Sequence, residues 1–106
     1  MIQFYAEGKG YRATIEEIIP GGQEAVDVGL KRDGKRIAVE VSVTTRVKHE
    51  MNNTRKCLEA NYGQIVVLFL EERKMTEFQG LIQESFPKED QLRISLGLAY
   101  DFCSFF

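Results

Sequence analysis

Two acidic residues lie inside otherwise apolar stretches of the segment AVDVGLKRDGKRIAVEVSVTT, which runs from residue 25 to residue 45. Asp27 and Glu40 are flanked mainly by Val, Ile, Leu, Ala and Gly, so burial would remove both carboxylates from water. Carboxylates that are close together and partly desolvated must become protonated, pair with cations or bind a metal ion. Mg²⁺ suits such a pair because it takes few protein carboxylates and keeps several waters.

The dipeptide Asp33-Gly34 between these stretches predicts a hairpin with a two-residue loop. In that register Asp27 lies opposite Glu40, with Cβ atoms roughly 4.5–5.5 Å apart. We expect the small Gly29 beside them to leave space for a ligand. The other face of the hairpin should be continuously apolar and consist of Val26, Val28, Leu30, Ile37, Val39 and Val41. A salt-bridged pair, with Lys56 or Arg12 as the partner, is the structural alternative to a metal site.

The elements that position these acids are predicted from hydrophobic periodicity and from turn residues. Alternating apolar residues indicate strands, and apolar residues at three- and four-residue steps indicate helices. The expected order is a helix at 1–8, strands at 11–19, 24–31 and 36–43, a helix at 46–62, a strand at 64–70, a helix at 72–86 and a strand at 92–98. Three antiparallel strands followed by a parallel crossover give a mixed-sheet α/β domain.

The size and composition of the chain agree with one globular domain over residues 1–106. Hydrophobic residues make up 43% and charged residues 28% of the sequence, which argues against a disordered chain. Because the first helix is short and the last residues are aromatic, the alternative that this domain is a piece of a larger protein stays open.

The charge is distributed unevenly although the net charge is only −2. Residues 31–56 contain eight basic and three acidic side chains, whereas residues 71–90 contain three basic and six acidic ones. A polyanion could therefore bind one side of the domain. Two solvated faces of opposite sign are the alternative.

The two cysteines, Cys57 and Cys103, are far apart, and the chain has one histidine. This composition argues against a structural zinc site and against a disulfide framework. No signal peptide and no apolar run of membrane-spanning length is recognisable, so we expect a cytoplasmic protein that makes no membrane contact.

The sequence resembles the PD-(D/E)xK, or restriction-endonuclease-like, nuclease superfamily. Val26-Asp27 matches the first motif without its proline, and Glu40-Val41-Ser42 matches the second with serine in place of lysine. The resemblance implies an αβββαβ core, here with an additional C-terminal helix and strand. It also implies Mg²⁺ or Mn²⁺ bound by Asp27, Glu40 and the carbonyl of Val41, and hydrolysis of phosphodiesters in nucleic acid, with DNA as the expected partner.

Some relatives take the missing lysine from the following helix, and this resemblance makes Lys56 the candidate. Ser42 could donate a hydrogen bond at the site but supplies no positive charge. For Lys56 the alternative is an ordinary surface lysine. Further residues that could line the site are His49 and Asn53 on the same helix, and Glu7 or Glu16 as a third acid.

Three functions remain open at this point. The first is a Mg²⁺-dependent endonuclease or phosphodiesterase. The second is a catalytically degenerate nuclease-fold module that binds nucleic acid or protein. The third is an assembly module whose aromatic end forms a homodimer or contacts a larger parent protein, through Tyr100, Phe102, Phe105 and Phe106.

Overall fold

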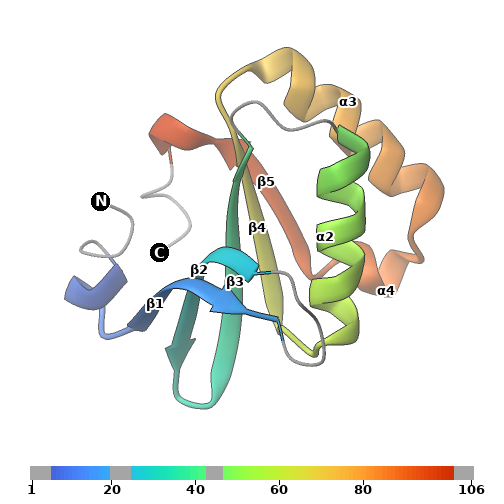
Figure 1. The fold of residues 1–106 in the computed structure, drawn as a ribbon. Helices are drawn as coiled ribbons and strands as arrows, with labels where there is room; N and C mark the ends of the chain where they lie inside the picture. The colour runs from blue at the N-terminus through green and yellow to red at the C-terminus, as the bar shows by residue number, and fades with distance from the viewer. Residues whose placement is uncertain (1–5, 20–24, 43–46, 102–106) are drawn as a thin grey trace.

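The computed structural model describes residues 6–19, 25–42 and 47–101, which form a mixed five-stranded sheet with helices packed on it (Figure 1). This architecture confirms the predicted α/β class and the predicted order of elements, apart from a short helix at residues 88–91 that was not predicted. Residues 6–8 are helical and precede the first strand. The elements that follow are β1 (Arg12–Ile18), β2 (Ala25–Arg32), β3 (Lys35–Ser42), α2 (Val47–Glu59), β4 (Gln64–Phe69), α3 (Glu72–Ser85), α4 (Lys88–Gln91) and β5 (Ile94–Leu98).

The strands lie in the sheet in their sequence order, β1-β2-β3-β4-β5. β1, β2 and β3 pair antiparallel, and β3, β4 and β5 pair parallel. Parallel neighbours need a crossover, which α2 supplies between β3 and β4 and α3 with α4 supplies between β4 and β5. Figure 1 shows α2 and α3 on the same side of the sheet.

The core between the sheet and these helices follows the predicted helix periodicity. Met51 and Leu58 of α2 are buried, and so are Tyr62 in the connection from α2 to β4 and Phe78 of α3. The rings of Phe78 and Phe69 are 5.4 Å apart between centroids, which joins α3 to β4. A second core on the opposite face of the sheet contains Ala6, Val28, Leu30, Ile37, Val39, Val66 and Leu68.

The two-residue turn at the end of the β2–β3 hairpin is confirmed. Arg32 pairs with Lys35, and the turn residues Asp33 and Gly34 have φ angles of 53° and 78°. Positive φ at both central positions is the geometry that Asp-Gly favours in a type I′ turn. The register then continues as predicted from this turn as far as the pair Val28–Val39.

The other end of the hairpin is distorted, and the expected continuous apolar face is wrong at Val26. Val26 packs in the core beneath the helices, whereas Val28 packs in the opposite core. β1 is irregular at the same level, because Glu16 has a φ of 54° between the pairs Ile15–Val28 and Glu17–Val26. The left-handed residue changes the direction in which the following side chains point.

Several expectations fall outside the described residues. Thr44 and Thr45, whose residue types and position before the helix predict a cap for α2, lie outside these residues, and so do Phe102, Phe105 and Phe106 of the aromatic end. Of the aromatic end, Tyr100 is described and is 74% exposed. No helix within residues 6–19, 25–42 and 47–101 has the length and apolar character required to cross a membrane.

Candidate functional site

The carboxylate of Asp27 is bound to the main chain of β3. Its Oδ2 accepts a hydrogen bond of 2.7 Å from the backbone N–H of Val41. In an uninterrupted two-residue hairpin, this N–H would be directed toward the main chain of Val26. The Asp27 side chain therefore replaces a ladder hydrogen bond at the point where the pairing between β2 and β3 ends. The side chain of Asp27 is exposed at this position.

Glu40 precedes Val41 on β3, and its side chain is buried. Glu40 and Ser42 are each 4% exposed. Because side chains alternate along a strand, both point to the same face as Ala38, which is part of the core beneath the helices. Val41 points to the other face and packs against the second core. The hydrogen bond to Val41 thus brings the Asp27 carboxylate to the residue next to Glu40.

Polar residues of α2 are buried on the side of the helix that faces the core. Glu50 and Asn53 are 2% and 6% exposed, and Thr54 is 1% exposed. Asn53 Nδ2 lies 3.3 Å from Nε2 of the exposed His49, so two of the residues expected to line the site contact each other. Sequence reasoning missed Glu50, although its four-residue spacing from Thr54 places both on one helix face.

The other predicted site residues come from three different parts of the fold. Lys56 is exposed in the last turn of α2, and Glu7 is exposed within the helical residues 6–8. Glu16 is exposed on β1 at the position that faces Asp27 in the β1–β2 register. Among residues 6–19, 25–42 and 47–101, no three acidic, histidine or cysteine side chains form a metal-binding group. The two acids of the predicted site, Asp27 and Glu40, lie on the neighbouring strands β2 and β3.

The space that we expected above Gly29 is filled by Glu17. A Cβ atom built on Gly29 would lie only 2.1 Å from Oε2 of Glu17. The expectation of open space beside the acids is therefore wrong at this position. The distortion at Glu16 supplies the physical reason, because it directs the Glu17 side chain across the sheet on the side of the helices.

Glu17 belongs to a polar network with Tyr62 and Arg36. The Tyr62 hydroxyl, whose residue is fully buried, donates a 2.5 Å hydrogen bond to Oε2 of Glu17. The Arg36 guanidinium lies 4.2 Å from the centroid of the Tyr62 ring. Burial raises the pKa of Tyr62 well above its ordinary value, and the hydrogen bond and negative charge of Glu17 raise it further, while Arg36 opposes them.

Comparisons with known proteins find a related fold. The chain is similar to a solved structure described as "Crystal Structure of Protein of Unknown Function AF1548", with a TM-score of 0.58 and 19% sequence identity. The match covers 94% of this chain and 56% of that protein, so this chain spans little more than half of its length. No protein-family model and no curated protein matches the sequence. At this identity the likeness concerns the fold alone.

Proposed function

We propose that this domain is a metal-dependent phosphodiesterase that acts on nucleic acid in the manner of the PD-(D/E)xK nucleases. The observation that carries the proposal is the 2.7 Å hydrogen bond from the Val41 N–H to Asp27 Oδ2, next to the buried Glu40. The sheet supports it as well, because β1, β2 and β3 form an antiparallel meander that is followed by a helix and a parallel strand.

The donor set fits a hard divalent cation. A carboxylate has two oxygens and can accept about four hydrogen bonds, so Asp27 keeps an oxygen for a cation after binding the Val41 N–H. Glu40 would add a second carboxylate, and Val41 would add its carbonyl. Mg²⁺ commonly binds proteins through one or two carboxylates and fills its other positions with water. When bound, the metal would supply a water that is oriented and acidified for attack on phosphorus.

Residues of the chain would orient the metal ligands and supply positive charge for the phosphate. The Val41 N–H fixes the orientation of Asp27, as outer hydrogen bonds do for ligating carboxylates. Glu40 is only 4% exposed beneath the helices, so the surrounding side chains restrict it to few conformations. Ser42 brings no charge to the site, so positive charge for the phosphate would have to come from α2, where Lys56 is our candidate.

The test is a titration of the protein with Mg²⁺ and Mn²⁺, followed by cleavage assays on labelled single-stranded, double-stranded and branched DNA. Asp27→Asn keeps an oxygen that can accept the Val41 N–H but removes the charge. We expect this variant to lose metal affinity by about tenfold or more and to lose cleavage. Glu59→Gln is the matched control, because Glu59 is an exposed acid at the end of α2 that does not belong to the proposed metal site. Unchanged metal affinity in Asp27→Asn would refute the proposed site.

A second candidate function is a nuclease-like module that binds nucleic acid without cleaving it. The buried, uncharged Ser42 at the position of the motif lysine favours this alternative. It predicts DNA binding that weakens steeply with salt, no turnover at any metal concentration, and nearly unchanged binding in Glu40→Gln. Turnover that requires Glu40 would exclude it.

A further inference from the structure

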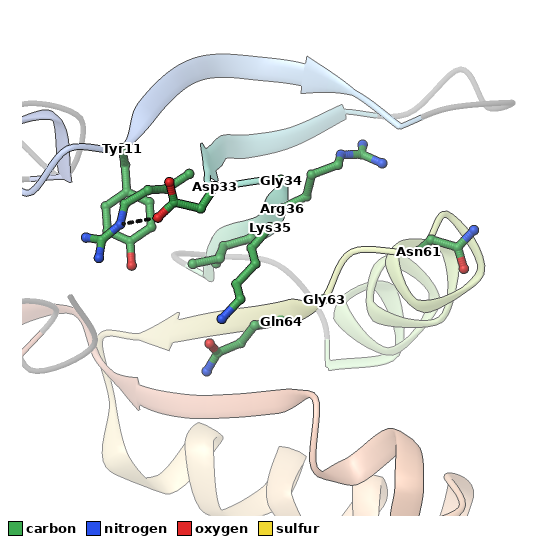
Figure 2. A pocket seen from close by; sticks show the side chains of 10 residues that line it. Tyr11, Asp33, Gly34, Lys35, Arg36, Asn61, Gly63 and Gln64 are labelled. Carbon is green, nitrogen blue, oxygen red and sulfur yellow. Dashed lines mark ion pairs between the residues drawn. The ribbon is translucent and has the colours of Figure 1, made fainter.

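A cavity of about 670 Å³ lies at the turn end of the β2–β3 hairpin (Figure 2). It is bounded by the hairpin, by Tyr11 and by the connection from α2 to β4. Its volume falls in the range of about 300–1,000 Å³ that is typical of small-molecule sites. The residues that line it are Tyr11, Arg32, Asp33, Gly34, Lys35, Arg36, Ile37, Asn61, Gly63 and Gln64.

The charge of the lining residues favours an anion. Arg32, Lys35 and Arg36 are cationic, and Asp33 is the one acid among the lining residues. Asp33 Oδ2 lies 3.5 Å from Nε of Arg32, so its charge is already offset within the turn. Arg36 also lies against Tyr62, whose hydroxyl is bonded to Glu17, so the charge of Arg36 is partly offset on the helix side. Arg32 and Lys35 together still exceed Asp33 by one positive charge, which complements an anion.

The two arginines are held in place by neighbouring groups of the protein. One nitrogen of Arg32 donates a 2.8 Å hydrogen bond to the carbonyl of Lys9, and its guanidinium lies 5.1 Å from the centroid of the Tyr11 ring. Arg36 donates to the carbonyl of Ala60 at 3.3 Å. Such contacts reduce the conformational entropy that ligand binding would otherwise cost.

Lys35 differs from the arginines in its surroundings. Its ammonium group makes no hydrogen bond or ion pair with the described residues. Figure 2 shows its side chain pointing toward Gln64 across the cavity. Gln64 is itself oriented, because its Nε2 donates a 2.8 Å hydrogen bond to Oγ of Ser95. Lys35 therefore presents ammonium donors to a ligand, beside a side chain that is already fixed.

We propose that this cavity binds a phosphate group, carried by a nucleotide or by a nucleic-acid strand. Lysine binds phosphate as a point charge, and arginine binds it through its planar fork of donors. The turn is open to a ligand at Gly34, because a Cβ atom built there would have no neighbouring atom within 4 Å.

This site does not depend on the proposed metal site. Asp27 is six residues from Asp33 along the extended hairpin, which corresponds to about 20 Å at about 3.3 Å per residue. A ligand small enough to fill the cavity would not reach Asp27. The two proposals can therefore fail separately.

The test uses NMR titrations of the full chain without divalent cations, with inorganic phosphate, adenosine 5′-monophosphate, adenosine and a short single-stranded DNA as probes. We expect phosphate-bearing probes to shift the amide resonances of Lys35, Asn61 and Gln64, and adenosine to leave them unchanged. Lys35→Gln should weaken binding about tenfold, because it removes one charged contact. Lys31→Gln removes the same charge from the same hairpin outside the cavity lining, and it should leave the affinity unchanged.

Each outcome decides the proposal. Binding of the mononucleotide that is sensitive to Lys35 supports it and makes a nucleotide the source of the phosphate. Binding of the DNA alone, with the same sensitivity, supports it and makes a nucleic-acid strand the source. Absence of shifts at about 10 mM of every probe would overturn it. Equal weakening by Lys31→Gln and Lys35→Gln would also overturn it, since that result indicates attraction by the overall charge of the hairpin.

Discussion

The contact between Gly29 and Glu17 makes Gly29→Ala a sharp test of how β1 and β2 pack beneath the helices. Gly29 is buried and its φ is not left-handed, so an alanine is compatible with the backbone itself. The added Cβ would nevertheless lie 2.1 Å from Oε2 and 2.3 Å from Cδ of Glu17. The Glu17 carboxylate must therefore move, and it cannot do so without disturbing its hydrogen bond from Tyr62.

The expected cost follows from two opposing contributions. Loss of a hydrogen bond to a charged group costs about 1.5–3 kcal/mol. Alanine in place of glycine stabilises by about 0.4–1 kcal/mol, because it restricts the unfolded chain. The net decrease in the free energy of unfolding is then about 1–2 kcal/mol. For a domain of this size we expect Tm to fall by about 4–8 °C.

A double-mutant cycle isolates the contact. In a Glu17→Ala background the obstructing side chain is absent, so Gly29→Ala should be neutral or stabilising by up to about 1 kcal/mol. Urea unfolding followed by circular dichroism measures all four proteins, and equal m-values would show that the changes reflect stability alone. The same effect of Gly29→Ala in both backgrounds would refute our account of the Gly29–Glu17 contact.

Three further predictions concern other parts of the fold. The free energy of unfolding should fall as pH rises above 10.0, because the unfolded chain releases the Tyr62 proton before the folded protein does. Tyr62→Phe should flatten this pH dependence, as measured by urea unfolding at about pH 9–11. Gly34→Ala should cost about 1–2 kcal/mol, since φ at this position is 78°, and a calorimetric Tm equal to that of the wild type would contradict the turn. Phe78→Ala should cost about 3–5 kcal/mol in urea unfolding, because Phe78 is fully buried against Phe69; a loss below 1 kcal/mol would contradict the packing of α3.

The sequence by itself determined the order of the elements and the register of the hairpin near its turn. Asp33-Gly34 fixes the pairing of Arg32 with Lys35 through local backbone preferences, which do not depend on the rest of the fold. The helix periodicity likewise identified residues that pack on the sheet, such as Met51 and Phe78. These features are local, so a short stretch of chain contains the information that specifies them.

Only the tertiary structure decided what happens at the other end of the hairpin. The left-handed φ of Glu16, the shift of Val26 to the helix side and the binding of Asp27 to Val41 depend on how three strands twist against one another. The hydrogen bond from Tyr62 to Glu17 likewise joins residues that are far apart in the sequence, so it forms only once the sheet is assembled. Alternation along one strand assumes a regular ladder, and it fails where a side chain takes the place of a main-chain hydrogen bond.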